Sequence, residues 1–114
     1  EVNTSFPKFI YKKMFKKFKN KLKKKNIGIL GMAFKSDIDD TRDSLSIDLW
    51  EYLKKKKLNV KISDNFVKMK EIIKTSELIK KSDIIIIGAP HTTYKNLKIP
   101  KNKFLIDSWG LFEK

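Results

Sequence analysis

The chain has 114 residues, carries a formal net charge of +14 and contains no cysteine. That length suits one compact domain with a core of its own, and the lack of cysteine excludes disulfides, cysteine-bound metals and a cysteine nucleophile from these residues. Because His91 is the only histidine, a cluster of histidine metal ligands is excluded as well.

The high charge raises the question of a nucleic-acid partner, but the kind of cation argues against specific recognition. Of the 27 basic residues only Arg42 is an arginine, whereas readout of bases and stacking on aromatic rings favour arginine's planar group. The lysines are spread over nearly every segment, which is typical of a compositional bias; diffuse attraction to phosphates remains an alternative. No apolar run approaches the roughly 18 residues that a membrane-spanning helix needs, so we expect no membrane span and a cytoplasmic protein.

Residues 1–25 predict an amphipathic helix that ends in a polar joint. Thr4 or Ser5 can cap its start, and Pro7 suits its first turn. Apolar side chains recur at every fourth position, namely Phe6, Ile10, Met14, Phe18 and Leu22. The opposite face is almost all lysine, so the helix either lies on a membrane surface or packs on a neighbour that need not belong to this chain. We favour the packed helix because an ordinary α/β unit follows it.

The rest of the chain alternates strands with helices. We expect strands at 27–31, 60–63, 71–74, 83–88 and 104–107. A helix capped by Asp43 or Ser44 should follow the first strand, and a brief helix capped by Thr75 or Ser76 should precede the fourth. This alternation predicts an α/β fold of three layers, α/β/α, with a five-stranded parallel sheet in the order 3-2-1-4-5.

Ligands of such sheets bind at the carboxyl ends of the strands, near the switch in strand order. The loops at 32–43, 89–95 and 108–110 all lie at those ends, so they hold the candidate site. Gly28 and Gly31 stand at the first of these ends, but they do not form the G-x-G-x-x-G fingerprint of a dinucleotide site. We therefore interpret these two glycines as structural, allowing tight contact between strand and helix.

Two acidic features of these strand ends have alternative interpretations. Asp64 ends the second strand, where a ribose-binding carboxylate can stand, but it follows Gly31 by much more than the roughly 20 residues of that motif; we favour a turn-capping role. The carboxylates between Lys35 and Asp43 could bind a divalent metal, yet they lack the glycine and glutamate of a calcium loop. We expect no metal there.

Three residues of these loops are candidates for ligand contacts. Lys35 and Arg42 could bind phosphate or carboxylate, although a structural salt bridge from Arg42 to Asp40 or Asp43 would explain that arginine nearly as well. His91 follows the central strand and could donate a hydrogen bond to a ligand oxygen. A hydrogen bond that stabilises the loop is the alternative that its spacing favours.

The stretch Ile27-Gly-Ile-Leu-Gly-Met-Ala-Phe-Lys-Ser-Asp-Ile-Asp-Asp-Thr-Arg-Asp-Ser44 resembles the segment that opens the C-terminal domain of the UDP-glucose/GDP-mannose dehydrogenase family. The likeness continues through the next helix and strand, through Gly88-Ala-Pro-His-Thr-Thr-Tyr94 and through Ile106-Asp107-Ser-Trp-Gly110. Residues 1–25 resemble the end of the family's central helix and its joint. The resemblance thus implies that residues 26–114 form a Rossmann-like domain that binds a UDP-sugar.

The resemblance also implies an activity. Family members oxidise the C6 hydroxyl of a nucleotide-linked sugar to a carboxylate with NAD+, which an N-terminal domain binds, and a cysteine of that domain forms the covalent intermediates. Phe34 and Lys35 match the residues that contact the nucleotide-sugar, and Arg42 matches an arginine that reaches NAD. His91 is added as a candidate for binding the substrate because of its position after the central strand. The central helix commonly builds a homodimer. No catalytic residue falls in this chain, so we expect it to be inactive alone.

One departure leaves the sugar open. Many members carry an arginine directly after the aspartate that ends the last strand, whereas Ser108 and Trp109 follow Asp107 here. The Pro-His-Thr-Thr-Tyr form resembles the branch that acts on acetamido sugars or related uronate precursors. Two other functions stay as alternatives: a stand-alone module that binds phosphate ligands or nucleotide-sugars, and a lysine-rich binder of nucleic acid or membrane surfaces.

Overall fold

Four short parallel strands form the centre of the fold in a computed structural model, which describes residues 5–33, 35–42 and 44–112. The sheet has the order β2-β1-β3-β4. The elements are α1 (Ser5–Phe18), η1 (Lys19–Lys24), β1 (Asn26–Leu30), α2 (Leu45–Lys55), β2 (Asn59–Ser63), α3 (Thr75–Lys81), β3 (Ile84–Ile87), η2 (Thr92–Asn96) and β4 (Phe104–Ile106), where η denotes a 3-10 helix. The predicted α/β class with a parallel sheet is confirmed.

The prediction of a fifth strand is wrong for the described residues, which form a sheet of four strands, so the five-stranded order 3-2-1-4-5 is not confirmed. The four strands that do form follow one another as 2-1-4-5 of that numbering. The segment 71–74 contributes one isolated parallel bridge, from Ile72 to Ile62 of β2, supported by a bond from the amide of Ile73 to the carbonyl of Ile62. A turn that closes from Met69 to Ile72 precedes this bridge, and α3 begins at Thr75. The segment between the turn and the helix is therefore too short to extend the pairing.

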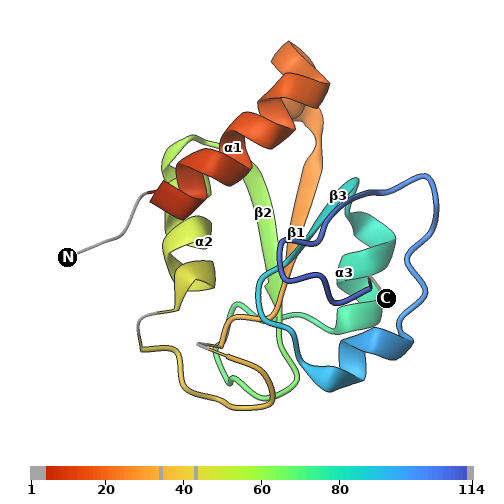
Figure 1. Cartoon of the computed structure of the whole chain (residues 1–114). Coiled ribbons are helices and arrows are strands. Elements are labelled where there is room, and N and C mark those ends of the chain that lie inside the picture. The colour runs from red at the N-terminus through yellow and green to blue at the C-terminus, as the bar shows by residue number, and fades with distance from the viewer. Residues whose placement is uncertain (1–4, 34, 43, 113–114) are drawn as a thin grey trace.

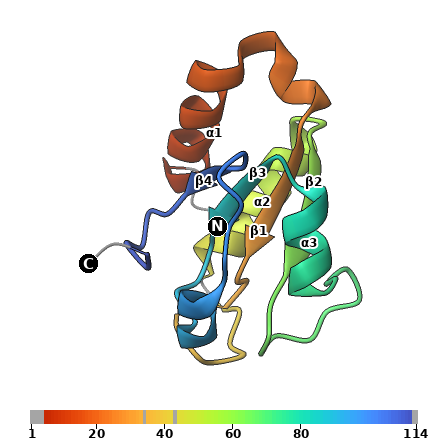
Figure 2. The ribbon, with the colours of Figure 1, turned by 90° about the vertical axis from the view of Figure 1, so that its right-hand side faces the viewer.

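The side chains of the strands alternate between two faces, and helices cover both. Ile27 and Ile29 of β1 pack with α1 and α2 in one cluster of buried residues. Leu30 packs with Leu78 of α3 and Tyr94 of η2 in a second cluster. Figures 1 and 2 show α1 and α2 on the opposite side of the sheet from α3. The four isoleucines of β3 are buried for this reason, because a parallel strand covered on both faces needs apolar residues at every position.

The first helix packs within this chain, not on a missing neighbour. Ile10 and Met14 of α1 are fully buried against α2 and the sheet, and Tyr11 meets Tyr52 of α2 edge-on at 6.3 Å between ring centroids. The predicted helix over 1–25 is shorter than expected, because η1 replaces its last turns at Lys19, whose φ of 53° is left-handed. The caps Thr4 and Asp43 proposed from the sequence lie outside the described residues.

The caps of the other helices follow the sequence in part. Ser44 caps α2 and accepts a hydrogen bond from the amide of Ile47 at 3.3 Å. The capping role predicted for Thr75 or Ser76 is wrong: Lys74 precedes α3 without a side-chain cap, and Thr75 is already helical. Its hydroxyl lies 3.1 Å from that of Ser63 at the end of β2.

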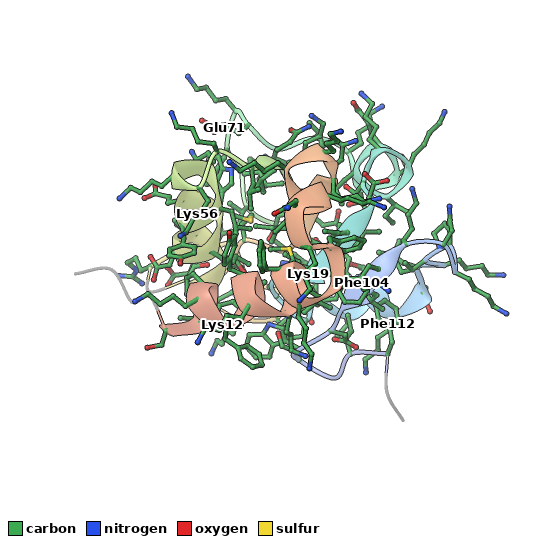
Figure 3. All side chains as sticks on the ribbon, turned by 90° about the horizontal axis from the view of Figure 1, so that it is seen from above. Lys12, Lys19, Lys56, Glu71, Phe104 and Phe112 are labelled. Atoms are coloured by element: carbon green, nitrogen blue, oxygen red, sulfur yellow. The ribbon has the colours of Figure 1, made fainter. Side chains whose placement is uncertain are left out.

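Exposed lysines occur in most of the helices and connecting segments. Figure 3, which looks down on α1, shows Lys12, Lys19 and Lys56 reaching outward from separate elements. The positive charge is thus spread over the surface instead of forming a single patch. Within the described ranges no helix has the length and apolar character required to cross a bilayer.

Candidate functional site

The loops that follow β1, β2 and β3 gather at the carboxyl edge of the sheet, the lower edge in Figure 1. Gly31 begins the first loop with φ at 98°, a conformation that L-residues rarely adopt. A Cβ on Gly31 would lie 2.5 Å from the backbone nitrogen of Ala89, so the loops after β1 and β3 approach each other closely here. Gly28 lies against Leu78 and Ser82 at α3. The structural interpretation of both glycines agrees with this geometry.

Asp64 binds the beginning of two loops at once. Its Oδ1 accepts hydrogen bonds from the amides of Phe66 and Val67, at 2.6 and 2.9 Å, which caps the turn after β2. Its Oδ2 accepts from the amide of Met32 at 2.6 Å, across the edge of the sheet. The turn-capping role predicted for Asp64 is therefore confirmed, and the bond to Met32 extends it to the loop after β1.

The same carboxylate pairs with His91, whose Nε2 lies 2.9 Å from Oδ2 of Asp64. Both side chains are fully buried. Burial raises the pKa of Asp64, but the hydrogen bonds from His91 and from the amides of Val67, Met32 and Phe66 lower it, and the net shift is downward. The carboxylate is thus ionised, and four hydrogen-bond donors stabilise its negative charge.

The second ring nitrogen of His91 is also occupied. Its Nδ1 accepts a hydrogen bond from the amide of Asp37 at 2.7 Å. Because an amide can only donate, Nδ1 must be unprotonated, so the proton of the neutral ring resides on Nε2 and is donated to Asp64. A direct contact between His91 and a ligand would require one of these bonds to break.

The side chain of Asp37 adds a second connection between the loops after β1 and β3. Its Oδ1 accepts from the amide of Thr92 at 2.9 Å and from the hydroxyl of Thr92 at 3.3 Å. Asp37 has a left-handed backbone with φ at 60°, which aspartate tolerates better than most residues. Asp37, Asp64, His91 and Thr92, which we call the loop clamp, therefore join the loops after β1, β2 and β3.

Aromatic rings enclose the buried histidine. Phe66 lies 4.7 Å from the His91 ring, and Tyr94 lies 5.3 Å from it, between centroids. Burial raises the pKa of the Tyr94 hydroxyl, and the negative charge of Asp64 raises it further. Tyr94 therefore stays neutral. Because its ring is buried beside His91, it shields the loop clamp from water on this side.

The sequence-predicted ligand residues lie on the loop that the clamp holds. Lys35 is exposed. Phe34 lies outside the described residues. Arg42 has an 88% exposed side chain and forms a two-point contact with Asp40, from Nε to Oδ1 at 3.1 Å and from a terminal nitrogen to Oδ2 at 2.8 Å. This is one of the two alternatives that the sequence left open for Arg42.

The Arg42 contact changes the titration of its partner. Hydrogen bonds from the side chain and backbone of Arg42 lower the pKa of Asp40 to about 2. The pair is exposed, so water and salt can compete with it, and the guanidinium can exchange Asp40 for another anion. Among residues 5–33, 35–42 and 44–112, no group of three or more acidic, histidine or cysteine side chains is placed to hold a metal ion.

Sequence reasoning identified Asp64 and His91 separately but missed their pairing. The two residues are 27 positions apart, and the first stands at the end of β2 while the second follows β3. Strand order alone gives a signal: β1 pairs with both β2 and β3, so the ends of those strands flank one loop. Ser46 was also missed; its buried hydroxyl donates to the carbonyl of Gly88 at 2.6 Å and fixes α2 to the end of β3.

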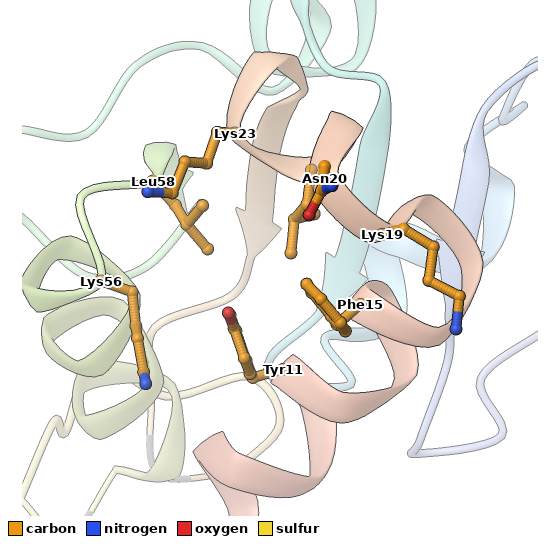
Figure 4. A pocket seen from close by; sticks show the side chains of 8 residues that line it. Tyr11, Phe15, Lys19, Asn20, Lys23, Lys56 and Leu58 are labelled. Carbon is orange, nitrogen blue, oxygen red and sulfur yellow. The ribbon is translucent and has the colours of Figure 1, made fainter.

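A hollow of about 290 Å³, lined by both apolar and lysine side chains, lies elsewhere, between η1 and the start of β2. Figure 4 shows the rings of Tyr11 and Phe15 facing Leu58 across it. Leu58 precedes β2, so the hollow is at the amino edge of the sheet, the edge opposite to the loop clamp. It is therefore separate from the candidate site.

Three comparisons connect this geometry with known proteins. Residues 28–114 match the sequence profile of the UDP-glucose/GDP-mannose dehydrogenase family, UDP binding domain. A UDP-N-acetyl-D-mannosamine dehydrogenase of Methanococcus aeolicus is 29% identical over 93% of this chain and 27% of its own length. The enzyme of the same name from Campylobacter jejuni is 49% identical over a shorter stretch, 43% of this chain and 12% of its own.

Solved structures agree on the fold. The UDP-N-acetyl-mannosamine dehydrogenase Cap5O of S. aureus superposes with a TM-score of 0.80 at 23% identity, over 98% of this chain and 28% of its own. A UDP-glucose dehydrogenase of Pyrobaculum islandicum gives a TM-score of 0.78 at 21% identity, over 92% and 26%. The chain thus spans less than a third of the length of these relatives.

Proposed function

The chain belongs to the UDP-glucose/GDP-mannose dehydrogenase family as its C-terminal domain, and on that premise we propose that it holds the nucleotide-sugar in an NAD-dependent nucleotide-sugar 6-dehydrogenase. The reaction that we propose for the whole protein is oxidation of the C6 hydroxyl of a UDP-sugar to the carboxylate. The observation that carries the proposal is the placement of Lys35 and Arg42 on a loop that the clamp anchors at the carboxyl edge of the sheet.

Lys35 and Arg42 suit different ligands, the nucleotide-sugar and NAD. We propose that Lys35, as a compact positive charge, contacts the diphosphate together with Phe34. Arg42 presents an exposed planar group that contacts the partly exposed carboxylate of Asp40, and an anionic ligand can compete for that contact. We propose NAD as that ligand. His91 supports the substrate contacts through the loop it anchors.

The chemistry itself belongs to another part of the protein in this proposal. The chain has no cysteine and no dinucleotide fingerprint at Gly28 to Gly31, so the residues present do not fit a complete NAD site. We propose that an N-terminal domain binds most of the NAD and carries the nucleophile, and that α1 continues a central helix through which the protein forms a homodimer. NAD, when bound, supplies the hydride acceptor; these residues bind and orient the substrate. We expect such an enzyme in the cytoplasm.

The sugar that we propose is an acetamido sugar. The support is that the relatives in Methanococcus aeolicus and Campylobacter jejuni are UDP-N-acetyl-D-mannosamine dehydrogenases. A stand-alone module that binds nucleotide-sugars without turnover is the second candidate function. The coding sequence upstream of Glu1 separates the two: a glycine-rich fingerprint and a cysteine there favour the enzyme.

The test is a titration of the protein, expressed with the coding sequence that adjoins it, with UDP, UDP-N-acetyl-D-mannosamine and GDP-mannose. We expect Lys35→Ala to weaken binding of the UDP ligands by about tenfold, since a charged hydrogen bond contributes about 1.5 kcal/mol or more. Lys24→Ala is the matched control, because it removes the same charge from the amino edge of the sheet. Equal affinities for the two variants would contradict the role of Lys35. Random DNA as a further ligand tests the lysine-rich alternative, which predicts binding that both variants retain.

A further inference from the structure

We propose that His91 is a positioning residue, which never touches the ligand but sets the place of Lys35 through the loop clamp. The inference rests on the proposed function, because it assumes that Lys35 meets the nucleotide-sugar. It adds a second requirement to that function: ligand binding depends on buried hydrogen bonds that hold the binding loop and that do not involve the ligand.

The anchored atoms flank Lys35 on both sides. Three residues before it, the amide of Met32 donates to Asp64, and two residues after it, the amide of Asp37 donates to His91. Because Met32 and Asp37 are both held, we infer that the place of the Lys35 backbone depends on these two bonds. A side chain that must meet a diphosphate loses affinity when its backbone moves by an ångström.

The clamp also supports a backbone conformation that would not persist by itself. Asp37 is held at φ 60°, and its amide and its carboxylate are both engaged, the first with His91 and the second with Thr92. A left-handed residue without glycine persists when surrounding contacts determine it. The conformation of the loop next to Lys35 therefore depends on His91 and Thr92, two residues of the segment after β3.

Burial makes this support rigid. The His91 side chain is 0% exposed, as is the side chain of Asp64, so water does not compete for their hydrogen bond. The ring is packed between Phe66 and Tyr94. A ligand at the surface thus reaches Lys35 and the clamp's outer members before it could reach the ring.

Three variants of His91 distinguish the roles of its two ring nitrogens. His91→Asn keeps an acceptor near the place of Nδ1 and loses the donor to Asp64. His91→Gln keeps a donor near the place of Nε2 and loses the acceptor for Asp37. His91→Leu keeps neither. Ile85→Val is the matched control. It lowers the stability of the protein by removing a buried methyl group from β3, and it removes no hydrogen bond from the loop clamp.

The first readout is hydrogen exchange of the Asp37 amide, measured with no ligand present. We expect His91→Leu and His91→Gln to speed this exchange by about tenfold while the amides of β3 stay protected, and His91→Asn to restore the protection. Unchanged exchange in both His91→Leu and His91→Gln would overturn the proposal. A readout on one amide also distinguishes a positioning role from a general loss of stability, which Ile85→Val would produce.

The second readout is affinity for UDP, measured on the protein with its adjoining coding sequence. Since one hydrogen bond is worth about a factor of five, we expect His91→Gln to lose about fivefold and His91→Asn to lose less. Wild-type affinity in a variant whose Asp37 amide exchanges freely would sink the inference. If the unsubstituted protein fails to bind UDP, the proposed function fails and the ligand role of His91 fails with it, whereas the exchange data still decide whether the clamp holds the loop.

Discussion

The Nε2 atom of His91 lies 2.9 Å from Oδ2 of Asp64, in a bond that both side chains make while fully buried. The residues come from the loops after β3 and β2, and each also binds the loop between them, which follows β1. The bond therefore completes a chain of hydrogen bonds that joins the carboxyl ends of the adjacent strands β2, β1 and β3. Its chemistry can be tested in several ways.

The tautomer of His91 is the first prediction. Nδ1 accepts from the amide of Asp37 at 2.7 Å, so the neutral ring must carry its proton on Nε2. Nitrogen NMR of labelled histidine distinguishes the two tautomers, and the chain has only one histidine to assign. We expect the Nε2–H form at pH 8. Observation of the Nδ1–H form would contradict the hydrogen-bond directions given above.

The acid sensitivity of the fold is the second prediction. Asp64 has a pKa below its ordinary value of 3.8, so its ionised form stabilises the fold above that value, and this stability is lost as the pH falls below it. Asp64→Asn should lower the free energy of unfolding by about 2–3 kcal/mol at pH 7, since it replaces a buried charged acceptor. Urea unfolding should show this difference shrinking below pH 3.8. A difference that is independent of pH would argue against the lowered pKa.

Sequence patterns were sufficient for the layers but not for the edge of the sheet. Alternating apolar runs predicted the strands at Asn26–Leu30, Asn59–Ser63, Ile84–Ile87 and Phe104–Ile106 to within a few residues. The run at 71–74 has the same local character, yet a turn before it and a helix after it limit it to one bridge. Local propensity does not report such crowding, because neighbouring elements decide how much of a strand can pair.

The candidate site could likewise be predicted from the sequence only in part. Lys35, Arg42 and His91 were identified as residues of strand-end loops, because strand ends are known once the strands are. That His91 faces inward, toward Asp64, follows only from packing, since a residue in an irregular loop has no periodicity to indicate its direction. The alternative that its spacing favoured, a bond that stabilises the loop, is the one found. Whether Lys35 and Arg42 bind ligands stays a prediction.

Titration of Asp40 is the third prediction. Its pKa of about 2 depends on the two-point contact with Arg42. Lysine has one ammonium group and cannot reproduce that contact, so Arg42→Lys should move the pKa of Asp40 back toward 3.8. Carbon NMR of the carboxyl group follows the titration. High salt should raise the pKa of the unsubstituted protein in the same direction, because an exposed pair is screened; a pKa insensitive to both changes would speak against the pair.

The close approach of two loops at Gly31 gives the fourth prediction. An alanine there must adopt φ 98° and place its Cβ 2.5 Å from the backbone nitrogen of Ala89. Neither the backbone angle nor the backbone atom can adjust cheaply, so Gly31→Ala should cost about 3 kcal/mol or more in the free energy of unfolding. Gly28→Ala is the comparison, because its Cβ would meet the flexible side chains of Leu78 and Ser82. Denaturant unfolding should find the Gly31 variant the less stable; the reverse order would refute the tight approach.

The role of α1 in the core gives the fifth prediction. Met14 is fully buried among the residues that α1 and α2 share, whereas Phe9 on the same helix is 52% exposed and lies under the ammonium group of Lys13 at 5.3 Å. Met14→Ala should therefore lower the free energy of unfolding by about 2–4 kcal/mol, and Phe9→Ala by less than about 1 kcal/mol. Thermal or urea unfolding of the 114-residue chain measures both. Similar losses for the two variants would mean that α1 is not part of this core, and that residues 1–25 belong with a neighbour outside the chain. A large loss for Met14→Ala alone means that α1 contributes to the core of the domain, even though the family's domain match begins only at residue 28.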